Sequence, residues 1–151
     1  MLVQDHVHGS SLLYKHESRV SSFDMMGDEL LFSSSFAGEI AQISLLEGKS
    51  VAVLNVPHEI SSLSVHNDLN ALLFTGRKTV KLWDHRTSDL NTLLKTRSVA
   101  SCTDNLDHFL IVGTRNGADV FDVRNPEGGS MHQIQFPNVR KAVFHPCLHR
   151  T

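Results

Sequence analysis

Histidine and cysteine are the side chains of this sequence whose spacing could hold a metal ion. The chain carries ten histidines and two cysteines, and they are densest in the stretch FHPCLHR, residues 144–150. His145, Cys147 and His149 alternate there, so on an extended strand they would share one face. A structural zinc site needs four well-placed ligands, and this stretch supplies three. The favoured interpretation is a turn around Pro146, and no metal site is predicted.

A catalytic serine or a phosphate-binding loop would leave a recognisable motif, and the sequence shows neither. There is no G-x-S-x-G elbow, and the stretch GTRNG, residues 113–117, lies between two predicted strands rather than before a helix. We therefore predict no enzymatic activity, no catalytic residue and no cofactor.

Two Asp-x-Arg motifs are the remaining candidates for a functional site. The stretch TVKLWDHR contains Asp84 and Arg86, and ADVFDVR contains Asp122 and Arg124. Residues two apart on an extended chain lie on the same side, so the simplest role is a local ion pair at a strand end. In the alternative role the arginines bind a protein partner, because the planar guanidinium recognises carboxylates and carbonyls with two hydrogen bonds.

Composition places the chain among ordinary globular proteins and disfavours two classes of partner. It has 151 residues, 40% of them hydrophobic, and a formal net charge of -2 with no run of lysine or arginine. Neither direct nucleic-acid binding nor a membrane partner is expected. The N-terminus lacks the features of a signal peptide and the two cysteines are too few for a disulfide framework, which indicates an intracellular protein of the cytoplasm or nucleus.

An internal repeat of about forty residues organises the sequence. The stretches RVSSF, EISSL, SVASC and NVRKA place Val20, Ile60, Val99 and Val139 at steps of 40, 39 and 40 residues. Each of the first three is followed by a second run (ELLFSSS, ALLFTG, HFLIVGT), a third run (EIAQISL, TVKLWD, ADVFDV) and a fourth run. The predicted units are residues 16–57, 58–96 and 97–137 within a single domain, 1–151.

The predicted fold class is all-β, with four short strands in each unit. The second runs are apolar at consecutive positions, as in Leu72-Leu73-Phe74, so these strands expect apolar neighbours on both faces. Four-stranded sheets of this length that cover one another are the blades of a β-propeller. Trp83 and Phe121 end the third runs in register and are predicted to pack between blades, and Cys102 is predicted to be a small core residue.

The residues resemble the WD-repeat family, most clearly through TVKLWDHR, with IVGTRNGADVFDVR as a drifted copy and LFSSSFAGEIAQIS as a weaker one. The resemblance implies a hydrogen-bonded His, Ser/Thr, Asp and Trp in each blade, and this network is incomplete here. The second unit has His58, Thr75 and Trp83 but no Asp in its turn. The first has His16 and Ser34 with Ile43 at the Trp position, and the third has Arg97 at the His position.

The number of blades is too small for a closed ring. Propellers close with about four to eight blades, and this chain supplies three, with part-blades expected at residues 10–15 and 138–151. We expect either a segment of a longer propeller or a half that closes by self-association, because open blade faces and strand edges favour association.

The paired motifs WDHR and FDVR are similar to the Trp-Asp-x-Arg signature of substrate receptors of cullin-4 RING ubiquitin ligases. That resemblance implies that Arg86 and Arg124, with Asp84 and Asp122, contact the damaged-DNA-binding protein 1 adaptor. The broader expectation is a noncatalytic protein-interaction scaffold. The alternatives are a subunit of a trafficking, nuclear-pore or chromatin assembly, or a truncated propeller without independent function.

Overall fold

The structure is a computed structural model that describes the backbone of residues 2–5 and 9–143 and the side chains of residues 12–143. The described part contains three four-stranded antiparallel sheets and one two-stranded sheet. The two-stranded sheet pairs β1 (Leu2–Asp5) with β2 (Gly9–Leu12). Sheet 1 consists of β3 (Val20–Met26), β4 (Leu30–Ser35), β5 (Glu39–Ser44) and β6 (Lys49–Asn55). Sheet 2 consists of β7 (Ile60–His66), β8 (Ala71–Gly76), β9 (Thr79–Asp84) and β10 (Asp89–Lys95). Sheet 3 consists of β11 (Ala100–Leu106), β12 (Phe109–Thr114), β13 (Gly117–Asp122) and β14 (His132–Gln135).

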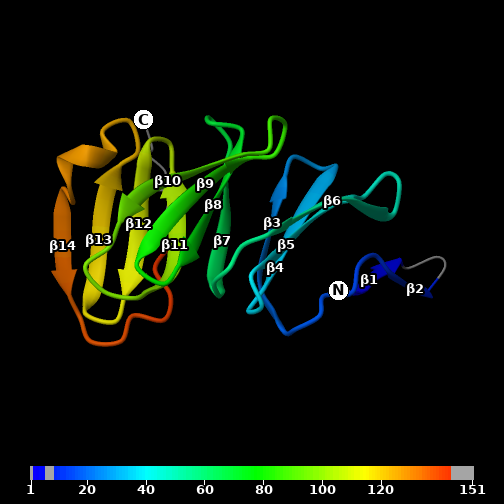
Figure 1. Cartoon of the computed structure of the whole chain (residues 1–151), viewed down its shortest axis with the longest axis horizontal. Helices are drawn as coiled ribbons and strands as arrows, with labels where there is room; N and C mark the ends of the chain where they lie inside the picture. The colour runs from blue at the N-terminus through cyan, green and yellow to red at the C-terminus, as the bar shows by residue number, and fades with distance from the viewer. Residues whose placement is uncertain (1, 6–8, 144–151) are drawn as a thin grey trace, which may run out of the picture.

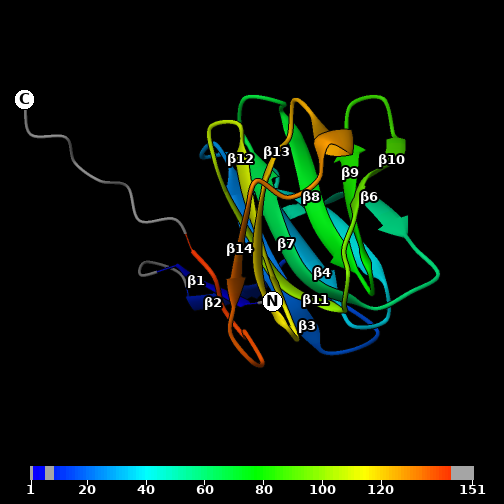
Figure 2. The same ribbon diagram turned by 90° about the vertical axis from the view of Figure 1, so that its left-hand side faces the viewer.

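The three large sheets stand side by side, each built from strands that follow one another in the chain (Figure 1). Figure 2 shows sheet 3 from its open side, with β14 in front and the other sheets behind it. The only helical segment of the described residues is a 3-10 turn, Pro126–Gly128. No helix in that same part of the chain is long and apolar enough to cross a membrane. The predicted all-β fold with three four-stranded blades is thus confirmed.

Side-chain hydrogen bonds link the first strands of neighbouring sheets. The hydroxyl of Ser22 donates to the carbonyl of Leu63 at 3.3 Å, and that of Ser61 donates to the carbonyl of Ala100 at 2.9 Å. Two residues further along both strands, the Asp24 carboxylate accepts from the Val65 backbone N–H at 2.7 Å. The residue numbers of the two strands therefore increase in the same direction. The first strands are therefore parallel, and the turns of all three sheets line up at two common ends.

We name these ends after their places in Figure 1. The upper end holds the turns between first and second strands and between third and fourth strands: residues 27–29, 45–48, 67–70, 85–88, 107–108 and 123–131. The lower end holds the turns between second and third strands and the connections that lead into each first strand: residues 16–19, 36–38, 56–59, 77–78, 96–99 and 115–116.

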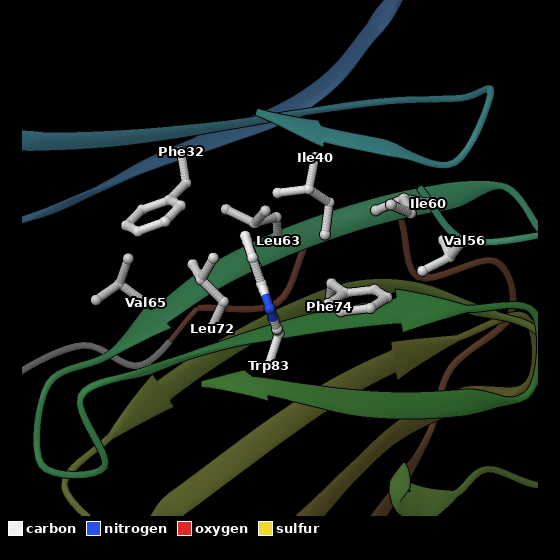
Figure 3. Packing of buried hydrophobic residues seen from close by; sticks show 9 residues of the cluster. All are labelled: Phe32, Ile40, Val56, Ile60, Leu63, Val65, Leu72, Phe74 and Trp83. Atoms are coloured by element: carbon white, nitrogen blue, oxygen red, sulfur yellow. The ribbon is translucent and has the colours of Figure 1, made fainter. Parts of the chain in front are cut away.

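Large apolar side chains fill the space between adjacent sheets. Trp83 of sheet 2 packs in one cluster with Phe32 and Ile40 of sheet 1 (Figure 3). The rings of Trp83 and Phe32 meet edge to face, with their centroids 6.3 Å apart. Phe121 of sheet 3 lies in a second cluster with Leu73 and other residues of sheet 2. The predicted packing of Trp83 and Phe121 between blades is confirmed.

Sheet 2 is covered on both faces, whereas the outer sheets are only partly covered on the face away from sheet 2. In sheet 1, β4 and β5 are buried on both faces, but β3 leaves apolar residues exposed. Leu72, Leu73 and Phe74 of β8 are fully buried, as their consecutive apolar pattern predicts. In β12 of sheet 3, Leu110 is buried against sheet 2 while Ile111 on the other face is only half-buried.

The structure corrects the predicted alignment in the third repeat. Ala100 begins the first strand of sheet 3 and is buried, while Val99 lies in the preceding turn and is 51% exposed. Cys102 is buried as predicted, but it lies opposite Gly113 rather than in the position of Leu63. Residues 136–143 contain no strand, and His145, Cys147 and His149 lie outside the described residues.

Candidate protein-interaction site at the strand ends

Asp84 and Arg86 form a bidentate ion pair at the upper end of β9. The backbone N–H of Arg86 donates to Asp84 Oδ1 at 3.0 Å, and Arg86 Nε donates to the same oxygen at 3.0 Å. Arg86 Nη2 donates to the other oxygen, Oδ2, at 2.8 Å. The carboxylate therefore holds both the turn and the guanidinium plane in one orientation.

Asp122 and Arg124 repeat this geometry at the upper end of β13. The backbone N–H and Nε of Arg124 donate to Asp122 Oδ1 at 2.9 and 3.0 Å, and Nη2 donates to Oδ2 at 2.7 Å. The ion pairs predicted from residue spacing are thus present in both sheets.

Both pairs stay charged across the physiological pH range. Hydrogen bonds from the arginine side chain, followed by the one from its backbone N–H, lower the pKa of Asp84 to about 2 and that of Asp122 to about 2. The same side-chain hydrogen bonds raise the pKa of Arg86 and of Arg124. The arginines are the exposed members: the side chains of Arg86 and Arg124 are 55% and 65% exposed, against 22% and 19% for their carboxylates.

The strands fix the position of the two ion pairs, because the residue that precedes each aspartate is buried between sheets. Trp83 and Phe121 are buried between sheets, so the next residue of each strand, Asp84 or Asp122, lies at the upper rim. Sheets 2 and 3 are neighbours with aligned ends, and the two arginines therefore lie at the same level of consecutive sheets. Sheet 1 lacks the motif: Ser44 stands at the aspartate position, and an ion pair of 2.9 Å joins Glu47 to Lys49 in its turn.

A buried polar network near the lower end of sheet 1 departs from the sequence-based prediction. His16 Nε2 lies 2.7 Å from the hydroxyl of Ser33, not Ser34, and His16 Nδ1 lies 2.8 Å from a carboxylate oxygen of Glu39. The Tyr14 hydroxyl donates to the other oxygen of Glu39, and this bond is the first cause that raises the pKa of Tyr14 to about 12. The sequence analysis did not predict that Tyr14 and Glu39 take part in this network. The signal that could have found Glu39 is the histidine at the start of the unit, because a histidine expected to be buried needs a hydrogen-bond partner.

The corresponding polar residues of sheets 2 and 3 are not joined in this way. His58 Nε2 and Trp83 Nε1 are buried and have no hydrogen-bond partner among the described residues. The Thr75 hydroxyl instead lies 2.7 Å from that of Ser61 and accepts the Ser62 backbone N–H at 3.0 Å. Arg97, at the histidine position of sheet 3, donates to Gln133 at 3.2 Å. Within residues 12–143, no group of three or more His, Cys, Asp or Glu side chains could hold a metal ion.

No protein-family model and no curated protein matches the sequence. Solved structures match the fold. One, titled "Structure of U3-55K", superposes with a TM-score of 0.70 at 15% sequence identity, covering 82% of this chain and 41% of that one. Another, titled "Crystal structure of RRP9 WD40 repeats", gives a TM-score of 0.69 at 15% identity with the same coverage. The fold is therefore that of part of a WD40-repeat propeller, and the chain spans about two fifths of the length of these structures.

Proposed function

We propose that this chain is a noncatalytic protein-interaction scaffold that binds a partner at its upper end through Arg86 and Arg124. The partner that the Trp-Asp-x-Arg resemblance suggests is the damaged-DNA-binding protein 1 adaptor, which would make the chain a substrate receptor of a cullin-4 RING ubiquitin ligase.

The observation that supports this proposal is the repetition of one geometry in two consecutive sheets. Arg86 and Arg124 are each held by the carboxylate two residues earlier through Nε and Nη2. Exposed ion pairs of this kind stabilise a fold little, so stability alone gives weak reason to place the same pair twice.

The ion pair also leaves each arginine able to bind a second group. Nη1 of Arg86 and of Arg124 makes no hydrogen bond to any described residue, so its donors face solvent. A guanidinium that is already fixed loses less conformational freedom when a partner binds. Asp84 and Asp122 then act as positioning residues, and the arginines contact the partner.

The test is a calorimetric titration of the full chain with the cullin-4 adaptor, using the wild type and the variant Arg86→Ala/Arg124→Ala. We expect the wild type to bind and each arginine to contribute roughly thirtyfold in affinity, as interface anchors do. The circular dichroism spectrum and thermal unfolding curve of the variant should match the wild type, because both side chains are exposed.

Lys49→Ala is the matched control, because Lys49 also forms an exposed ion pair in a turn at the upper end, in sheet 1. Its affinity for the adaptor should equal that of the wild type. If the wild type does not bind, or if the double variant binds equally well, the adaptor is not the partner and the arginines serve only their own turns. The general scaffold function would then stand without this site.

A further inference from the structure

The fold separates charges that alternate along the sequence. Lower-end turns and the strand residues that adjoin them carry six cations and three acids. The cations are Arg19, Arg77, Lys78, Lys95, Arg97 and Arg115, and the acids are Glu17, Glu39 and Glu59. Of these acids, Glu39 is already bound to His16 and Tyr14. The lower end is therefore positively charged.

The upper end has the opposite charge. By the same definition, its turns carry nine acids and three cations among the described residues. The acids are Asp28, Glu29, Glu47, Asp68, Asp84, Asp89, Asp107, Asp122 and Glu127, and the cations are Lys49, Arg86 and Arg124. All three of these cations are paired with carboxylates. A formal net charge of -2 thus conceals a molecule with two oppositely charged ends.

A groove in the lower end gathers the cations of sheet 2. It has a volume of about 990 Å³ and is lined by the connections that enter and leave the sheet, by the turn between β8 and β9, and by residues of β9 and β10. The lining includes the cations Arg77, Lys78 and Lys81, together with His58, Glu59 and Val99. None of the three cations lies within 4.0 Å of a carboxylate of the described residues.

The backbone of this groove is fixed by the neighbouring sheet. Arg77 adopts a left-handed conformation with a φ of 47°, and its carbonyl accepts the Ala100 backbone N–H at 2.7 Å. The positive charges of the groove also act on His58. Its pKa is lowered first by burial and then by the charges of Lys81 and Arg77. A groove that gathers several positive charges attracts anionic groups more strongly than a single surface cation does.

We infer that this lower-end groove binds an acidic peptide segment of a partner protein, through Arg77, Lys78 and Lys81. A peptide fits the lining better than a nucleic acid, because the lining has no Phe, Tyr or Trp for a base to stack on, and the ring of His58 already packs against Gly76. The carboxylate of Glu59 would also repel a continuous phosphate backbone, whereas a peptide can place an uncharged residue beside it. Exposed Val99 and the methyl groups of Thr79 and Thr92 offer apolar contacts along the same groove. This groove lies at the opposite end from Arg86 and Arg124, so the inference is independent of the adaptor proposal.

The test is fluorescence anisotropy of the full chain with a fluorescein-labelled twelve-residue peptide that alternates glutamate with glycine or serine. The reference probes are the same peptide with glutamine in place of glutamate, and a single-stranded oligonucleotide of twelve nucleotides. We expect binding of the glutamate peptide that weakens with added salt, and weaker binding of both references. The variant Arg77→Gln/Lys78→Gln/Lys81→Gln should lose about tenfold in affinity or more, because it removes the attractive charges.

Lys78→Glu and Lys49→Glu form the matched pair. Both residues are exposed and both substitutions change the net charge equally, but Lys78 lines the groove and Lys49 lies at the upper end. Binding should weaken with Lys78→Glu and stay unchanged with Lys49→Glu. Equal weakening by the two variants would show attraction by net charge alone and overturn the proposed site. Tighter binding of the oligonucleotide, or no binding of the glutamate peptide by the folded chain, would overturn the peptide as the ligand.

Discussion

Three histidines lie in surroundings that disfavour their charged form. Burial is the largest cause that lowers the pKa of His58, His66 and His85. Nearby charges modify the effect: Lys81 and Arg77 lower the pKa of His58 further, Asp68 raises that of His66, and Asp84 raises that of His85. Nε2 of each ring is buried without a hydrogen-bond partner among residues 12–143. All three are therefore structural residues that fit the fold in their neutral form.

We predict that the free energy of unfolding decreases as pH falls from 7.5 to 5.5. Above the ordinary pKa of histidine, about 6.5, both the folded and the unfolded chain carry neutral rings, and the pH has no effect through them. Below it the unfolded chain takes up protons first, because the folded-state pKa values are lower, and protonation favours unfolding. Urea denaturation at the two pH values measures this change.

His66→Asn should reduce the pH dependence of the urea midpoint, since His66 is the most buried of the three, at 1% exposure. The control is His132→Asn, at an exposed position of β14. A midpoint that rises as the pH falls, or a dependence unchanged by His66→Asn, would contradict the interpretation.

At the scale of the strand and turn, glycine is required where a turn of sheet 1 lies against the connection that follows its last strand, β6. Gly38, in the turn between β4 and β5, has a φ of +88°, and a Cβ there would lie 2.2 Å from the carbonyl oxygen of Val56 and 2.6 Å from that of His58. Both are backbone atoms, which cannot rotate away. The Gly38 carbonyl also accepts the Val56 backbone N–H at 2.8 Å, so the turn is held in place.

Gly38→Ala should destabilise the chain by about 3 kcal/mol or more, because it adds a backbone clash to a disfavoured conformation. Gly48→Ala is the matched control: its φ is +65°, but a Cβ there meets nothing within 4 Å. It should cost about 1–2 kcal/mol from the backbone conformation alone. Chemical denaturation of both variants measures the difference, and equal losses would show that the clash is relieved by movement of residues 56–58.

The repeat predicts the strands well because hydrophobic runs and turn residues are local properties. The pattern of Leu72, Leu73 and Phe74 predicts burial on both faces of β8, and the structure confirms it. The alignment failed by one residue at Val99, because the buried residue that begins β11 is Ala100, and its small side chain does not stand out beside the larger Val99. The bulge in the first strand does not distinguish the third repeat, since the strand pairing shifts at the same place in all three sheets.

At the scale of the molecule, the charged ends were beyond reach of sequence reasoning. Successive turns fall at opposite ends, so acidic and basic turns alternate along the chain and average to a small net charge. Only the parallel stacking of the first strands adds the turns of like charge together. The two Asp-x-Arg pairs were predictable, since each depends on two residues at one strand end. The groove of Arg77, Lys78 and Lys81 was not, because its lining comes from connections that lie about forty residues apart in the sequence.

Exposed apolar residues at both ends of the stack predict self-association of the purified chain. Ser22 and Asp24 contact sheet 2, so the alternating residues Phe23 and Met25 point away from it, and they are 63% and 44% exposed. At the other end of the stack, Ile134 of β14 and Phe136, which follows that strand, are likewise exposed. Apolar faces of this kind associate to leave water.

Sedimentation velocity should show species larger than a monomer that grow with protein concentration. Phe23→Lys/Met25→Lys should shift the distribution toward monomer, while Lys49→Ala should not. A compact monomer at every concentration, with a single cooperative unfolding transition, would contradict the prediction.

The hydrogen bonds that serines of the first strands donate to main-chain carbonyls also bear on how freely this sequence can change. Ser22, Ser61 and Ser101 supply the donors, while the acceptors are the main-chain carbonyls of Leu63, Ala100 and Val139. Those three acceptors share no side-chain chemistry, because any residue offers a carbonyl. Each of these three hydrogen bonds thus requires a serine on the donating side and no particular residue on the accepting side. Substitutions can accumulate at the accepting positions without removing the hydrogen bond, and a stack can keep these links while its repeats cease to resemble one another.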